Sequence, residues 1–99
     1  MKPSKKGKQI MSIIIKQIEI IERIDQLIRL QATGTPSQLA RRLEISKTKL
    51  HRTITIMREL HAPIVFDLTI QSYVYEEEVG FEFGFYKGRQ RSRLNPFVG

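Results

Sequence analysis

The 99-residue sequence contains no cysteine. Disulfide bonds and thiolate chemistry are therefore excluded, and a reducing cytoplasm suits the chain. Long apolar runs are also missing: none exceeds three residues, as at Ile13-Ile14-Ile15, which is far short of a membrane span. The lysines near the amino terminus precede no long apolar core with a small-residue cleavage site, so we expect no signal peptide. Together these absences predict one small cytoplasmic domain.

Groups of residues that could carry catalysis or bind a metal ion are missing as well. His51 and His61 are ten residues apart on one expected helix. This separates them by about 15 Å along the helix axis, too far to share a metal ion. Ser46 has no general base at a useful spacing, and the acidic run at 76–78 comes without histidine or a calcium-loop turn. We therefore expect no enzyme activity, no metal and no cofactor.

The formal net charge is +7, and it is unevenly distributed. Residues 1–16 carry five lysines and residues 87–99 carry four basic residues, with no acid in either segment. Residues 17–86 carry eight basic and ten acidic residues. Basic ends suit contacts with nucleic-acid phosphates, and they also act simply as solubilising tails. Both interpretations of the two ends stay open at this point.

The same pattern divides the chain into three parts. Because its first nine residues are polar and without periodicity, we predict a disordered basic arm at 1–12. A folded domain follows at 13–86, and a basic tail at 87–99. Met11 is a second candidate for the natural start of the chain, with the lysine-rich piece before it as an upstream extension.

Two short helices joined by a tight turn are predicted by the segment TPSQLARRLEISKTKLHRTITIMREL. Thr35 suits an N-cap, Pro36 follows at the first helical position, and Gln38 completes a capping box. This helix ends near Glu44-Ile45, and Ser46 caps the next helix. The apolar face of the first helix consists of Leu39, Ala40 and Leu43.

The second of these helices has an apolar face and a polar one. The core-facing residues recur at helical spacing and are Leu50, Ile54, Met57 and Leu60. At 100° per residue, Thr48, Arg52 and Thr55 point the opposite way. This outward row is flanked by Lys47, Lys49 and His51. A short helix, a turn and a helix with a basic leading edge form a helix-turn-helix, whose second helix enters the DNA major groove.

An isoleucine-rich helix is predicted before this pair, from Ile13 to Gln31, and Gly34 is expected to end it in the left-handed conformation. One stripe of this helix consists of Ile14, Ile18, Ile21, Ile24 and Ile28. Part of the stripe would pack on the helix pair. The surplus near residues 10–20 predicts a homodimer through this helix; the alternative is an extended arm or an ordinary core helix.

Alternating patterns after Pro63 predict three strands. Ile64, Phe66 and Leu68 alternate in the first, and Tyr73 and Tyr75 in the second, with a short connection between them. The third strand is predicted by alternating rings at Phe81, Phe83 and Phe85. Its neighbours are acidic or glycine, so core or dimer packing fits these rings better than stacking on nucleic acid.

The span from about Ile18 to Phe85 resembles the small winged helix-turn-helix domains of bacterial transcription regulators. The resemblance is carried by ERIDQLIRL, GTPSQLARRLEIS, LHAPIVFD and SYVYEE, and it is strongest for the DeoR-like and WYL-type amino-terminal domains and the stand-alone forms of Bacteroidetes. It implies an α+β fold, with a three-helix bundle and a small antiparallel sheet that forms the wing. It also implies binding to double-stranded DNA.

Three positions depart from the family pattern. Glu44 stands where relatives usually have glycine in the turn, and a left-handed conformation there would add strain of roughly 1 kcal/mol. His61 replaces another glycine, although histidine tolerates positive φ better than most residues. The tip at 68–72 has no lysine or arginine, so this wing lacks the basic side chain with which the wings of relatives often contact DNA.

We predict a sequence-specific DNA-binding protein of transcriptional control, associated with the nucleoid. Thr48, Arg52 and Thr55 would read base edges, and Arg52 suits guanine best. Flanking bases or phosphates would be bound by Lys47, Lys49 and His51. The DNA backbone would be held by Thr35, Ser37, Gln38, Arg41, Arg42 and the helix start at Ser46. The alternatives are a protein-interaction adaptor or dimerisation module without specific DNA binding, and general architectural binding through the basic ends.

Overall fold

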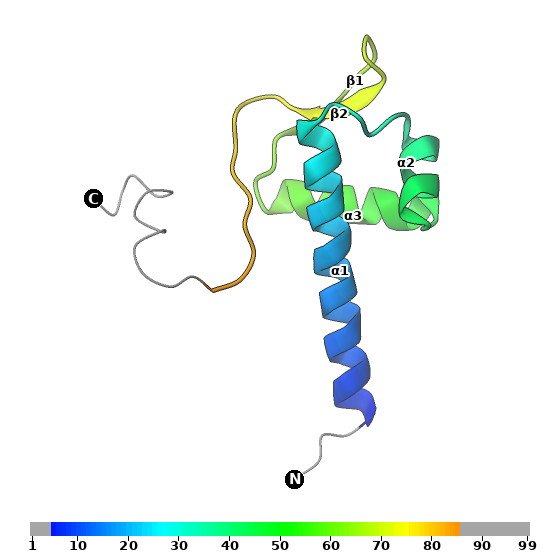
Figure 1. Ribbon diagram of the computed structural model, residues 1–99, viewed down its shortest axis with the longest axis vertical. Coiled ribbons are helices and arrows are strands. Elements are labelled where there is room, and N and C mark those ends of the chain that lie inside the picture. Colours follow the sequence, from blue (N-terminus) through cyan, green and yellow to red (C-terminus); the bar gives the residue numbers. More distant parts are fainter. Residues whose placement is uncertain (1–4, 86–99) are drawn as a thin grey trace, which may run out of the picture.

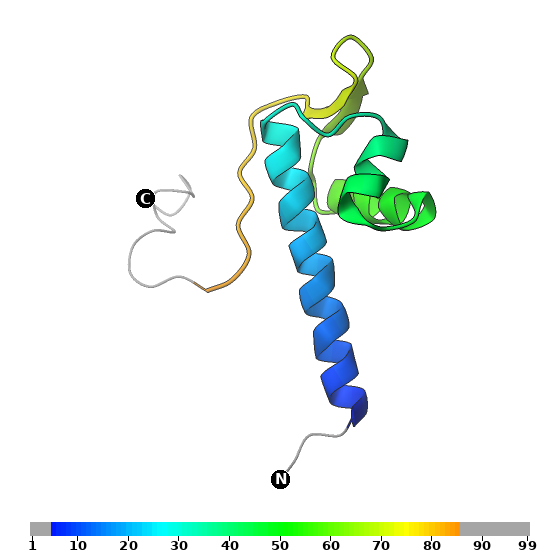
Figure 2. The ribbon, with the colours of Figure 1, turned by 45° about the vertical axis from the view of Figure 1, so that its right-hand side comes forward.

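The computed structural model describes residues 5–85, and their side chains from residue 10 onward. These residues form an α+β arrangement of three helices and a two-stranded antiparallel sheet (Figure 1). In chain order the elements are α1 (Lys5–Arg29), α2 (Pro36–Leu43), α3 (Lys47–Glu59), β1 (Ile64–Asp67) and β2 (Ser72–Tyr75). The second half of α1 packs against the other elements, whereas its first half projects away from them (Figures 1 and 2). None of the helices in the described residues is long and apolar enough to cross a membrane.

Helix α1 is longer than the sequence predicts, and its end differs too. It begins at Lys5, so the prediction of a disordered arm is wrong for residues 5–12, while residues 1–4 lie outside the described residues. Lysine, glutamine and methionine are good helix formers, and this segment contains no proline to stop the isoleucine helix from extending backwards. The helix ends at Arg29, and Gln31 rather than Gly34 takes the left-handed position, two residues after this end, at φ 53°.

Gly34 has a different role from the one predicted for it. It is also left-handed, at φ 73°, but it lies in the loop before α2. A side chain at this position would collide with Gln38, whose Oε1 accepts the backbone N–H of Thr35 at 2.8 Å. In return the Thr35 hydroxyl accepts the N–H of Gln38 at 3.2 Å. The predicted capping box is therefore confirmed, and Gly34 makes room for it.

The core forms where three helices and the sheet meet. Its buried apolar side chains are Ile21, Ile24, Ile28, Leu39, Ala40, Leu43, Leu50, Ile54, Met57, Ile64 and Tyr73. The apolar faces predicted for α2 and α3 are thus confirmed, with one exception. Leu60 is 63% exposed, because it follows the last residue of α3 and the chain turns away at His61, whose φ is 76°.

The sheet is a hairpin in which Ile64 pairs with Tyr75 and Asp67 with Ser72. The predicted third strand is absent: residues 78–83 and 85 have no regular structure, and Gly84 is a bend at φ 125°. The outward edge of β2 is already occupied at Tyr73, whose N–H donates to the Thr33 hydroxyl at 2.8 Å. Of the three aromatic rings only that of Phe81 packs against the core, and Phe85 is fully exposed.

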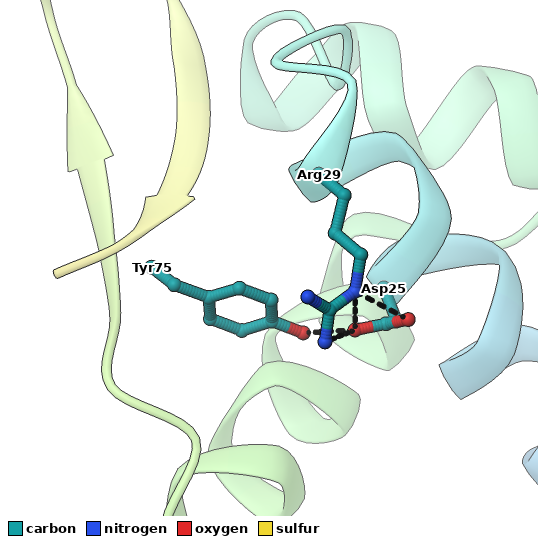
Figure 3. A network of polar contacts seen from close by, with 3 residues as sticks. All are labelled: Asp25, Arg29 and Tyr75. Atoms are coloured by element: carbon teal, nitrogen blue, oxygen red, sulfur yellow. Dashed lines mark hydrogen bonds and ion pairs between the residues drawn. The ribbon is translucent and has the colours of Figure 1, made fainter. Parts of the chain in front are cut away.

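A buried carboxylate joins the sheet to α1 (Figure 3). Asp25 is 7% exposed, and it accepts the Tyr75 hydroxyl at 2.7 Å and the Arg29 Nε at 3.0 and 3.1 Å. The Arg29 guanidinium also lies over the Tyr75 ring, 5.2 Å from its centroid. Burial, and then the hydrogen bond to Asp25, raise the pKa of Tyr75 above the usual 10.0. The three side chains together fix the position of β2 on α1.

We expect Tyr75 to make stability fall at alkaline pH. Above pH 10 the phenol ionises in the unfolded chain but stays protonated in the folded one, so unfolding releases a proton and is favoured as pH rises. Chemical denaturation of the wild type and of Tyr75→Phe at a series of pH values from 8 to 11 measures this. The variant should be less stable at pH 8 because it loses the bond to Asp25, and its stability should fall less steeply above pH 10. Equal alkaline slopes would contradict the assignment.

Glu44→Gly should raise the free energy of unfolding by about 1 kcal/mol, because Glu44 is left-handed, at φ 57° and ψ 43°, as the turn requires. Glu44→Ala is the matched control, since it removes the same charge but keeps the Cβ that causes the strain. Denaturant titration of the three proteins separates the two effects. A gain for alanine as large as that for glycine would assign the effect to charge rather than to the backbone.

Candidate nucleic-acid interface

The outward face of α3 lies on the side of the helix opposite the core. Leu50, Ile54 and Met57 are buried beneath α3, whereas Thr48, Arg52 and Thr55 are all exposed. Successive members of this outward row lie four and three residues apart, so they follow one line along the helix. The structure therefore brings together the three residues to which the sequence analysis assigns base contacts.

The start of α3 is fixed by a tight turn that several hydrogen bonds hold. The N–H of Glu44 bonds to the Arg41 carbonyl at 3.1 Å, and that of Ile45 to the Ala40 carbonyl at 3.0 Å. The Ser46 hydroxyl then caps α3 by accepting the N–H of Lys49 at 3.0 Å. These bonds hold the two helices at a set orientation, and they leave the first turn of α3 exposed to solvent.

Exposed cations surround this turn. Arg41, Lys47, Lys49 and Arg52 are exposed, and no hydrogen bond or ion pair engages their side chains within residues 10–85. Segment 35–58 holds six basic residues against the single acid Glu44. The ion pair of the described residues, Arg29 with Asp25, lies beside the sheet and does not reduce this charge. The result is a positive surface on which, within the described residues, no ion pair engages a basic side chain, and such a surface suits an anionic partner.

Two further arginines have contacts within the fold. The Arg42 Nη1 donates to the Ala32 carbonyl at 2.9 Å, and the Arg58 Nε donates to the Ile64 carbonyl at 3.1 Å. Arg42 thus fixes the loop that leads into α2, and Arg58 ties α3 to β1. A guanidinium carries five N–H donors, so an exposed arginine with one such contact still has donors to offer a phosphate.

The capping side chains at the two helix starts keep their donors free. Thr35 and Ser46 use their hydroxyl oxygens as acceptors, and Gln38 uses its amide oxygen. Their O–H and NH₂ groups are not used in the caps, and Ser37, in the first turn of α2, is exposed. Because phosphate oxygens accept hydrogen bonds, this set of donors matches the backbone contacts predicted for it. His51 is exposed on α3 beside this surface.

The hairpin tip carries no cation, and hydrogen bonds hold its turn. The Asp67 carboxylate accepts the N–H of Thr69 at 2.8 Å and that of Ile70 at 3.4 Å, and the Gln71 Nε2 donates to the Leu68 carbonyl at 2.8 Å. Leu68 is 75% exposed and Ile70 is 41% exposed. The tip thus presents two aliphatic side chains and no cation, in agreement with the departure noted in the sequence.

One residue that positions α3 was missed by the sequence analysis. Thr53 is 1% exposed; its hydroxyl accepts the Gln17 Nε2 at 3.2 Å and donates to the Lys49 carbonyl at 2.9 Å. It holds α3 against α1 just behind Arg52. Its position three residues after Leu50 and four before Met57 places it on the apolar face, which is the signal that could have identified it.

The basic tail predicted at 87–99 lies outside the described residues, so the candidate interface consists of α2, the turn and α3. Comparisons with protein-family models, with curated proteins and with solved structures found no match to this chain.

Proposed function

We propose that the chain is a winged helix-turn-helix protein that binds double-stranded DNA in a sequence-specific manner, in transcriptional control. In this proposal α2 and α3 are the helix-turn-helix, and the β1–β2 hairpin is the wing. The observation that carries it is the outward face of α3, where Arg52 lies between two threonines. This face is exposed and cationic, and within the described residues no carboxylate pairs with it.

The spacing of the outward row supports a short sequence-reading element. Thr48 and Thr55 are seven residues apart, which is about 10 Å along a helix. Base pairs follow one another every 3.4 Å or so, and the row therefore spans about three of them. The Arg52 guanidinium would donate two hydrogen bonds to O6 and N7 of a guanine, and the threonines would contact neighbouring base edges or thymine methyl groups.

Phosphate contacts would fix the register of α3 in the groove. Lys47, Lys49 and His51 lie beside the row and would reach the two flanking backbones. The start of α2, with Ser37 and Gln38, offers donors to a phosphate, and Arg41 adds charge. Because the hairpin tip has no cation, most of the salt dependence would come from the two helices.

Selection from a random pool of DNA duplexes tests the function directly. Enrichment of one short motif, with affinity that rises steeply as salt is lowered, is the expected result. Enrichment of no motif would refute sequence-specific binding. Loss of all affinity on deleting residues 1–9 and 87–99 would replace it with general architectural binding through the ends.

Arg52→Ala should cost about 1–3 kcal/mol on the selected sequence and relax the preference at one base pair. Arg52→Lys is the matched control, because it keeps the charge but loses the bidentate geometry. Titrations of both variants on the selected duplex and on a random duplex measure the difference. If Arg52→Ala loses the same affinity on both duplexes, Arg52 contacts the phosphate backbone and does not read a base.

Lys49→Ala should weaken binding to all duplexes alike and lower the slope of log affinity against log salt by about one. Lys16→Ala removes the same charge from the projecting half of α1 and should leave the slope unchanged. Binding measured at four or five salt concentrations provides both slopes. An unchanged slope for Lys49→Ala would place this lysine outside the interface.

A protein-interaction adaptor is the second candidate, and a separate observation favours it. An apolar hollow of about 300 Å³ opens between α1, the end of α3 and residues 79–81; its lining includes Met57 and Leu60. It lies away from the outward row of α3. The adaptor predicts that Leu60→Gln abolishes capture of a protein partner, whereas Arg52→Ala has no effect on it.

A further inference from the structure

The first half of α1 carries apolar side chains that nothing in the described structure covers. Ile10, Met11, Ile13, Ile14 and Ile15 are between 51% and 66% exposed. Among the described side chains, the hydrogen bond from α1 to another element that lies nearest to the start of the helix is that from Gln17 to Thr53. The first half of α1 projects from the domain (Figures 1 and 2). Such a patch, on the order of several hundred square ångströms, is the size of surface that usually marks an interaction site.

From these observations we infer that a second copy of this chain covers the patch, through an antiparallel pair of α1 helices. Four apolar residues recur at intervals of three and four along one side of the helix: Met11, Ile14, Ile15 and Ile18. This stripe lies about a quarter turn from the stripe of Gln17, Ile21, Ile24 and Ile28 that faces the domain. A partner helix on it therefore lies beside the domain and does not displace the core.

The charge distribution along α1 selects the antiparallel orientation. The sequence of the helix is basic over residues 5–8 and at Lys16, and it carries Glu19 and Glu22, both exposed, before the exposed Arg23. A parallel pair would set the basic start of one helix against that of the other, and Glu22, which lies near the stripe, against Glu22 of the second copy. An antiparallel pair sets the basic start of each helix opposite the acidic middle of the other, which favours association.

The register follows from matching apolar layers. With the twofold axis between residues 14 and 15, Met11 lies opposite Ile18 of the second copy, and Ile14 lies opposite Ile15 of the second copy. Each layer occurs twice because the interface is isologous. Residues 5–8 then lie opposite residues 21–24 of the other copy, the turn that contains Glu22. About 30 Å of each helix overlaps, which is a small interface, so micromolar dissociation is expected.

This dimer has a consequence for DNA, which rests on the proposed function. The two Ile24 residues, one in each domain, would lie about 30 Å apart along the common axis. That separation is close to one turn of B-DNA, so the pair would suit an inverted repeat with half-sites one helical turn apart. A motif selected from random duplexes would then be palindromic.

Sedimentation velocity without DNA tests the dimer independently of the proposed function. The full chain should pass from monomer to dimer over the micromolar range. Ile15→Gln should weaken the dimer about tenfold or more, because two isoleucines per dimer lose their burial. Ile13→Gln is the matched control: Ile13 is at least as exposed, at 66%, but lies on another side of α1, so its dimer should be unchanged. Circular dichroism checks that both variants stay folded.

Single cysteines in this cysteine-free chain report the orientation. In the proposed register Ile14→Cys lies next to its own copy and should form a disulfide on oxidation. Met11→Cys is about 10 Å from its own copy along the axis and should not. The proposal is overturned if the chain stays monomeric at all concentrations. It is also overturned if the chain stays monomeric and sediments with anionic lipid vesicles, because the patch would then bind lipid and not a second copy. Equal weakening by Ile13→Gln, or equal cross-linking of Met11→Cys, overturns the stated face or orientation. Because DNA is absent from these measurements, a failed dimer leaves the specificity test of Arg52 intact.

Discussion

The burial of one isoleucine stripe holds this small domain together. Ile24 and Ile28 are almost completely buried, and Ile21 is 7% exposed, against side chains from α3 and the sheet. Burying each such side chain contributes about 1.5–3 kcal/mol, a large share of the stability that so small a domain can have. Because α2 packs mainly on α3, the orientation of the candidate interface is in turn set by the contact of α3 with α1. The contact of α1 with the buried side of α3 thus sets the orientation of the surface that would read DNA.

Hydrogen bonds between polar side chains fix the positions of elements that apolar burial alone does not determine. Asp25, Arg29 and Tyr75 fix the sheet on α1, while Thr53 and Gln17 fix α3 on the same helix. No buried polar side-chain atom within the described residues lacks a hydrogen-bond partner. Buried polar groups that are fully paired favour one arrangement over its near neighbours, because a shift would leave one of them unpaired. This matters for a basic surface whose individual side chains are long and flexible.

The sequence predicts those features whose cause is local. The capping box at Thr35 and the cap at Ser46 follow from side chains within a few residues of each other, and both are confirmed. The apolar faces of α2 and α3 follow from periodicity. Of the candidate site, the exposure of the outward row and of the neighbouring cations was predictable in the same way. Whether these residues bind DNA is a separate question, because exposure and charge do not name a partner.

The features that the sequence did not predict depend on contacts between distant residues. A third strand requires a free edge on β2, and Thr33, 40 residues earlier in the chain, takes the place of that strand at Tyr73. Likewise nothing near Arg42 in the sequence indicates that its guanidinium reaches the loop before α2. The prediction of disorder at the start of α1 is wrong for another reason. It rested on the clustered lysines, but lysine is a good helix former, and the isoleucines that follow continue the helix.

The occupied edges of the hairpin bear on the behaviour of the protein at high concentration. On β2 the Tyr73 carbonyl accepts the Ser72 hydroxyl as well, and on β1 the Ile64 carbonyl accepts Arg58. Open strand edges are templates on which sheets grow from molecule to molecule into fibres. Here side chains of the same fold occupy part of each edge, at Tyr73 on β2 and at Ile64 on β1. Pairing of this two-stranded sheet with a strand of another molecule would first have to break these hydrogen bonds, which disfavours such growth.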